Sequence, residues 1–250
     1  MKRVFAFIIM LFALNITEVN AQKKVVVLDI SCEAKEEYLK VSPDIFNNYR
    51  EIIEDQFGAN LIINEETQVD SSLLKNTDLL IILSTLSGTT VKKTRSESEI
   101  NSIVNFVKNG GRLILFTDEN RRVNMEAFGA NQIVGPFGMA FGDDLPMQRN
   151  VGAISFPGVF IQGRYELPYS GSRELKGGIP ISVMNAEGGH LHGAYIKTGN
   201  GGKLVAFGET MVGLFIGGVE AKMPDGSVLV WKGKDNYPFM KELIGWMLKD

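Results

Sequence analysis

The stretch SESEINSIVNFVKNGGRLILFT, residues 96–117, contains a helix, a turn and a strand in immediate succession. Ser96 followed by Glu99 is a capping box, the pattern in which two side chains satisfy free backbone N–H groups at a helix start. Apolar residues then recur at helical spacing through residues 100–107. Asn109-Gly110-Gly111 ends the helix, and the six residues after it are mostly apolar and β-prone. We predict a helix that leads directly into a buried strand.

Similar units stand on both sides of this stretch. Continuous apolar runs of this kind are typical of strands that are covered on both faces of a parallel sheet. Further strands are predicted at Val25–Ile30, Leu61–Ile63, Leu79–Leu83 and Gly202–Gly208. Helices are predicted from Pro43 to a C-cap at Gly58, and from Tyr237 to Leu248. Because strands and helices alternate, we expect an α/β fold: an open, mostly parallel sheet with helices on both faces.

Residues 131–200 break this alternation. They hold many of the glycines and most of the prolines of the chain, with several short apolar pieces between them. We predict a β/loop-rich insertion here, an irregular elaboration within a single domain that spans residues 22–250.

The first 21 residues have the order of a cleavable signal peptide. Met1-Lys2-Arg3 is basic, residues 4–14 are apolar, and Val19-Asn20-Ala21 supplies the residues that a signal peptidase reads. An uncleaved anchor fits less well, because polar residues from Asn15 onward interrupt the apolar run before it is long enough to span a membrane. We expect cleavage after Ala21, a periplasmic or secreted protein, and no integral membrane segment after cleavage.

Composition narrows the class of partner. The chain has 26 basic and 29 acidic side chains, which gives a net formal charge of −3. This charge does not favour binding to nucleic acid or to an anionic membrane surface. Its single cysteine, Cys32, cannot form an internal disulfide, so the fold must rely on its core.

Three segments together resemble a known family. Residues 96–116, 202–209 and 235–248 are similar to class I glutamine amidotransferase-like domains, most of all to the non-catalytic branch related to the GIFT domain of intraflagellar-transport proteins and to uncharacterised exported bacterial domains. The resemblance covers most of the chain after the leader and implies a flavodoxin/amidotransferase-like sheet. It also implies a binding role, with a glycan as one suggested ligand.

The catalytic residues of amidotransferases are not found at the matching positions. The family places a cysteine in a glycine-flanked turn after a central strand, whereas the turn here reads Thr117-Asp118-Glu119-Asn120-Arg121-Arg122. The family's late histidine is also missing, since Gly208-Glu209-Thr210 follows the late strand. Without a thiolate and its base there is no acyl-enzyme route, so the sequence argues against amidotransferase activity.

Ligands of open parallel sheets gather beyond the carboxyl ends of the strands. The polar residues that directly follow the predicted strands are therefore our candidate ligand-binding residues, in positions where they do not serve the core: Ser84, Thr85, Asp118, Glu119, Asn120, Arg121 and Glu209. Each of them taken singly is better explained as part of an ordinary polar loop that caps the next helix; their convergence on one edge is what favours a shared pocket.

Two histidines form a weaker candidate. His190 and His192, two residues apart, would share one face of a strand and could begin a metal site of the cupin kind. That pattern needs a glutamate four or five residues later, and Ile196 and Lys197 stand there instead. We predict neither a metal nor a cofactor; the Gly-x-x-x-x-Gly-Lys-Ser/Thr pattern of a phosphate-binding loop does not occur.

Two hypotheses for function remain open. The first is an exported, non-catalytic binding module on an amidotransferase-like scaffold, for a small polar ligand, a glycan or a protein partner. The second is an exported hydrolase that uses Asp118, Glu119 and Glu209 as acid and base, with His190 or His192. A hydrolase of that kind needs two carboxyl groups whose pKa values are pushed apart.

The leader makes the first prediction. Expressed with its full sequence in a Gram-negative host, the protein should be recovered from the periplasm or medium with Gln22 at its amino terminus, because all three parts of a cleavable leader are present. Intact-mass spectrometry measures this. A product that keeps Met1 or carries a lipid would contradict it.

Overall fold

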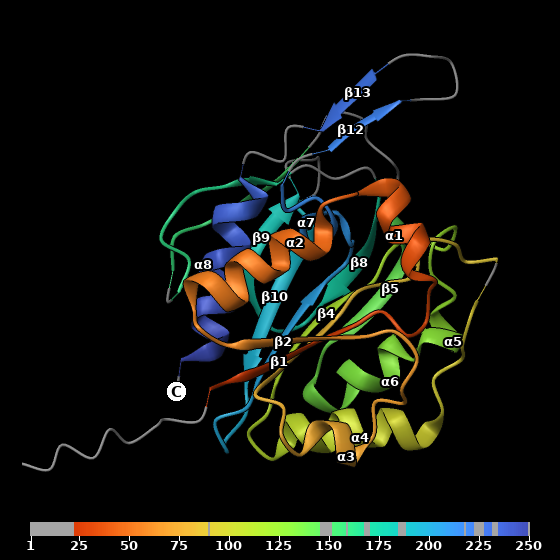
Figure 1. Cartoon of the computed structure of the whole chain (residues 1–250), viewed down its shortest axis with the longest axis vertical. Coiled ribbons are helices and arrows are strands. Elements are labelled where there is room, and N and C mark those ends of the chain that lie inside the picture. The colour runs from red at the N-terminus through yellow and green to blue at the C-terminus, as the bar shows by residue number, and fades with distance from the viewer. Residues whose placement is uncertain are drawn as a thin grey trace, which may run out of the picture.

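The computed structural model describes residues 23–89, 91–145, 152–158, 160–167, 171–184, 189–217, 219–222, 228–231 and 235–249. The predicted leader lies outside the described residues. Figure 1 shows a twisted central sheet with helices packed on its two faces, which confirms the expected fold class.

Five parallel strands form the centre of the sheet, in the order β2-β1-β3-β4-β11. Their bounds are β1 Val25–Asp29, β2 Asn60–Asn64, β3 Leu79–Ile82, β4 Arg112–Phe116 and β11 Lys203–Phe207. All five match strands predicted from apolar runs. The order corresponds to that of flavodoxin-like sheets, in which the chain changes direction of winding between its first and third strands.

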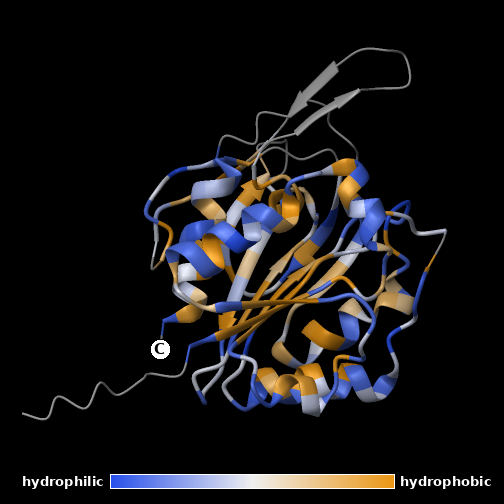
Figure 2. Ribbon diagram, in the orientation of Figure 1, coloured by the Kyte–Doolittle hydropathy of each residue, from blue (hydrophilic) through white to orange (hydrophobic). Residues whose placement is uncertain are grey.

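Successive side chains of these strands enter two separate cores. Leu79 and Ile81 pack in the core on one face of the sheet, and Leu80 and Ile82 pack in the core on the other. Apolar strands run through the middle of the molecule, with mixed helices around them (Figure 2). A strand buried on both faces needs apolar residues at every position, which is why the runs are continuous in the sequence.

The helices divide between the same two faces (Figure 1). The first face carries α1 Lys35–Val41, α2 Ile45–Arg50, the π-helix η1 Glu51–Gln56, α7 Met211–Leu214 and α8 Asn236–Leu248. The second face carries α3 Ser71–Leu74, α4 Glu97–Lys108, α5 Met125–Phe128, α6 Ala130–Val134 and the 3-10 turn η2 Gly135–Phe137.

Two helix predictions are confirmed in detail. The capping box is present at α4, where the Ser96 hydroxyl accepts from the Glu99 N–H and the Glu99 carboxyl group accepts from the Ser96 N–H. Gly58 follows the α2–η1 helix with a φ of 64°, the left-handed conformation that a glycine takes at a C-cap. Sequence periodicity did not reveal that the second half of this helix is a π-helix.

The insertion contains short strands, as predicted, and these extend the central sheet. Its strands pair antiparallel, in contrast to the parallel centre, and β10 joins them to β11. They are β5 Ala140–Leu145, β6 Ala153–Ser155, β7 Glu166–Leu167, β8 Ser172–Lys176, β9 Ile179–Met184 and β10 Leu191–Lys197. A separate hairpin, β12 Val219–Lys222 and β13 Val228–Trp231, was not predicted. Within the described ranges, no helix has the length and apolar character needed to cross a bilayer.

Candidate functional site

Three loops meet at the carboxyl edge of the parallel strands. The loop after β3 contacts the loop after β4 twice: the Thr85 hydroxyl donates to the Arg122 carbonyl at 2.6 Å, and the Gly88 N–H donates to the Arg121 carbonyl at 2.8 Å. The loop after β11 joins them through the Thr210 N–H, which donates to Asp118 Oδ2 at 3.3 Å. The structure thus brings together the loops that carry the candidate residues.

Most of these residues are not at the surface. Ser84, Thr85, Asp118, Glu119 and Glu209 are all buried, and Asp118 and Glu209 are 0 % exposed. We expected polar residues that follow strands to lie outside the core. They are instead an internal polar layer, because the antiparallel extension and the neighbouring loops pack over this edge.

The crevice between β1 and β3, where flavodoxin-like sheets bind ligands, is filled by internal contacts. The Tyr38 hydroxyl donates to the Ser84 carbonyl at 2.7 Å, and the Leu86 N–H donates to Glu33 Oε2 at 3.1 Å. Ser84 itself donates to the Thr85 carbonyl at 3.0 Å. Ser84 and Thr85 therefore hold the loop after β3 in place.

Asp118, at the end of β4, has the most perturbed environment of this edge. Its Oδ2 lies 3.2 Å from Arg122 Nη1, and its Oδ1 accepts from the Glu119 N–H at 2.9 Å. The pKa of Asp118 is raised to about 7, mainly because the side chain is buried; Arg122 lowers the pKa and the nearby Glu209 adds to the rise. Asp118 therefore changes its protonation state near neutral pH.

Glu209, directly after β11, forms the centre of a second set of contacts. His192 Nε2 lies 2.8 Å from Glu209 Oε1, and His192 Nδ1 lies 2.8 Å from the Ser182 hydroxyl. Both side chains that flank His192 are 0 % exposed, as is His192 itself. The Glu209 carboxyl group also accepts from the Met211 and Val212 N–H groups at the start of α7.

The sequence named His192 and Glu209 separately but missed Ser182. The register of β9 and β10 places Ser182 opposite Gly193, beside His192. Only a glycine fits there: a Cβ at Gly193 would lie 2.4 Å from the Phe207 ring and 3.0 Å from the Ser182 hydroxyl. A lone serine in the apolar run of β9 was the available signal.

His190 precedes β10 and is half-buried, and the described residues contain no group of three metal-ligating side chains.

Asn120 and Arg121 are the candidates that face solvent. The Arg121 side chain is 53 % exposed and pairs with Glu119. Both carboxyl oxygens of Asp144 accept from the Asn120 N–H at 3.0 Å, and the Asn120 side-chain oxygen accepts from Arg173 Nη2. The loop after β4 therefore presents an exposed arginine, and hydrogen bonds of the neighbouring Asn120 with Asp144 and Arg173 hold this loop in place.

Arg173, on β8, holds this loop to the antiparallel extension, and sequence reasoning missed it. Its Nε donates to the Asp118 carbonyl at 3.1 Å and its Nη1 donates to the Gly142 carbonyl at 2.8 Å. Nη2 also lies 3.1 Å from Asp144 Oδ1. One planar guanidinium group thus fixes three chain segments, a geometry that its several rigid donors allow.

Comparison with known proteins supports the fold and little else. No family model matches the chain, and no curated protein matches it. Among solved structures, the mmIFT52 N-terminal domain superposes with a TM-score of 0.59 at 10% identity, over 91% of this chain and 98% of that one. This likeness agrees with the fold implied by the intraflagellar-transport resemblance, and at this identity it shows the fold alone.

Two further structures superpose less well. A ThuA-like protein from Bacteroides uniformis has a TM-score of 0.49 at 10% identity, over 76% of this chain and 84% of that one. An exo-beta-1,4-mannosidase from Opitutaceae bacterium strain TAV5 has a TM-score of 0.48 at 12% identity, over 76% of this chain and 32% of that one.

The environment of Asp118 makes the second prediction. Since its folded-state pKa lies above the ordinary value of 3.8, the folded protein holds this proton more tightly than the unfolded chain does. Asp118 should therefore lower the free energy of unfolding by up to about 1.4 kcal/mol per pH unit as pH rises from about 4 to about 7. Asp118→Asn removes the titrating group, so its stability relative to the parent should rise across that range.

Urea unfolding at pH 5, 6 and 7 measures this difference. Asp143→Asn is the matched control, because Asp143 is an exposed carboxylate in the same region. If Asp118→Asn and the parent show the same pH dependence, Asp118 does not titrate as its surroundings indicate.

Proposed function

We propose that this chain is an exported binding module on an amidotransferase-like scaffold, which recognises a small polar ligand, a glycan or a protein partner at the carboxyl edge of its sheet. The observation that carries the proposal is the loop after β4, where an exposed arginine stands on a backbone held by hydrogen bonds from three neighbouring segments. The buried candidates, Asp118 and Glu209, have a supporting role in this proposal.

Preorganisation is the physical argument for binding at this loop. The loop is bonded to the β3 loop through Thr85, to β5 through Asp144 and to β8 through Arg173. A surface that is already ordered loses little conformational entropy when a ligand binds. Arg121 offers a planar group with several donors, which suits carboxylate, phosphate or paired hydroxyl groups.

A hydrolase remains the second candidate, and one observation favours it. The Ser182–His192–Glu209 chain, with two contacts of 2.8 Å, has the order of a hydroxyl group, a base and an orienting acid. Asp118, with a pKa of about 7, would add a group suited to proton transfer at neutral pH. Against it, these side chains are 0 % exposed, so a substrate would reach them only after the edge opens. A serine-directed fluorophosphonate that labels Ser182 would favour this candidate over the binding module.

The binding proposal makes the third prediction. A glycan and metabolite screen with the mature protein should find a ligand whose affinity Arg121→Ala lowers by at least about tenfold, since truncating one partner of a charged contact costs about 2 to 5 kcal/mol. The variant should still fold, because the Arg121 side chain is half exposed, but with a lower free energy of unfolding, because the buried Glu119 loses its partner. Arg164→Ala, which removes an exposed arginine elsewhere, is the control and should retain full affinity. A ligand that binds the Arg121 variant as well as the parent would place recognition elsewhere.

A further inference from the structure

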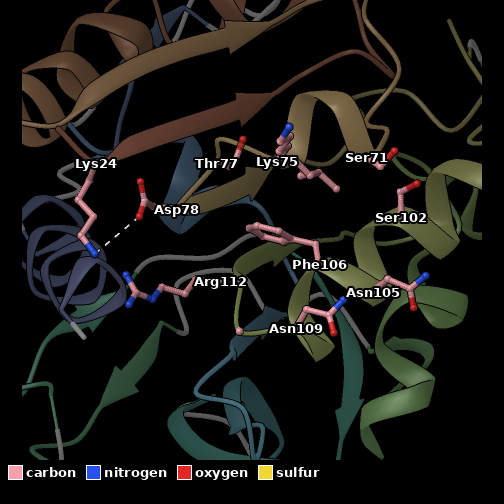
Figure 3. A pocket seen from close by; sticks show the side chains of 13 residues that line it. Lys24, Ser71, Lys75, Thr77, Asp78, Ser102, Asn105, Phe106, Asn109 and Arg112 are labelled. Atoms are coloured by element: carbon pink, nitrogen blue, oxygen red, sulfur yellow. Dashed lines mark ion pairs between the residues drawn. The ribbon is translucent and has the colours of Figure 1, made fainter. Parts of the chain in front are cut away.

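A pocket of about 520 Å³ opens at the amino ends of β1, β3 and β4, the edge opposite to the one that carries Arg121. Its walls come from α3, from the second half of α4 and from the residues that precede the three strands (Figure 3). The lining residues that bear on a ligand are Lys24, Lys75, Asp78, Asn105, Phe106 and Asn109. The volume lies within the range of about 300 to 1,000 Å³ that is usual for small-molecule sites.

Positive charge predominates in this pocket. Lys24, Lys75 and Arg112 line it together with a single carboxylate, Asp78. Asp78 already accepts from the Val25 N–H at 2.8 Å and lies 3.6 Å from Lys24 Nζ, so its charge is largely compensated within the wall. The Lys75 backbone N–H donates to the Ser71 carbonyl at 3.0 Å, whereas its exposed side chain makes no hydrogen bond or ion pair with any described residue. The pocket therefore favours an anion, with Lys75 available to contact it.

The other walls offer a ring face and neutral hydrogen-bonding groups. Phe106 lies between the charged side, with Lys24 and Arg112, and the side formed by Ser102 and Asn105 (Figure 3). Gly111 lets the start of β4 approach one side of this ring, since a Cβ there would lie 2.5 Å from it. The side chains of Asn105 and Asn109 are exposed and each supplies a donor and an acceptor.

We propose that this pocket binds a monosaccharide that carries a carboxylate, a uronate. Lys75 pairs with the carboxylate, the Phe106 ring packs against the apolar face of the sugar ring, and Asn105 and Asn109 bond its hydroxyl groups. The site is separate from the loop that carries Arg121, so it goes beyond the function proposed for that loop and stands or falls independently of it.

The fourth prediction concerns the affinity of the mature protein for glucuronate, measured by isothermal titration calorimetry at low salt. Lys75→Gln should weaken binding about tenfold, because it removes a charge-assisted contact. Lys108→Gln is the matched control: Lys108 is also an exposed lysine of this region, on α4 but outside the lining, and its variant should bind as the parent does. Glucose, which lacks the carboxylate, and acetate, which lacks the ring, should each bind at least about tenfold more weakly than glucuronate.

Several outcomes overturn this assignment. They are no measurable glucuronate binding, an unchanged affinity in Lys75→Gln, and glucose or acetate binding as tightly as glucuronate. If Arg121→Ala weakens glucuronate binding while Lys75→Gln does not, the ligand lies at the carboxyl edge and the pocket is refuted. Phe106→Leu, which keeps an apolar side chain without the ring face, should weaken glucuronate more than acetate.

Discussion

The contact between Glu209 and His192 lies where the two halves of the sheet meet. Glu209 follows β11, the last parallel strand, and His192 lies on β10, the first antiparallel one. From there the chain of contacts continues to Ser182 on β9, while the same carboxyl group accepts from the N–H groups that begin α7. Polar groups buried in this way stabilise a fold only when their hydrogen bonds are made, so the surrounding segments must keep these positions.

Asp118 depends on that arrangement. It shares the buried edge with Glu209, and the proximity of the two carboxyl groups adds to the effect of burial on the Asp118 pKa. Arg122 and the Thr210 N–H partly compensate it, and Arg173 bonds the Asp118 carbonyl. The carboxyl edge is therefore a rigid polar interior whose solvent-facing part is the loop with Asn120 and Arg121. The amino edge differs, since its charged and amide side chains line an open pocket.

The parallel centre was predictable because its strands and helices carry local signals. The continuous run of β3 and the capping box at Ser96 each fix one element without reference to distant parts of the chain. The carboxyl edge was located for the same reason, since parallel strands deliver their loops to one side. Its burial was not predictable: it depends on Arg173, Ser182 and His192, which reach the edge through the register of antiparallel strands with weak local patterns. The amino-edge pocket was missed because Lys24, Lys75 and Phe106 lie in three separate segments.

A double-mutant cycle on Glu209 and His192 tests the central claim that this buried pair stabilises the junction between the two halves of the sheet. Glu209→Gln and His192→Gln should each lower the free energy of unfolding by at least about 2 kcal/mol, because each leaves buried polar partners unpaired. The double variant should lose clearly less than the sum of the two, as expected for residues in direct contact. If either single variant is as stable as the parent or more stable, the claim is contradicted, and the pair is kept for function at the expense of stability.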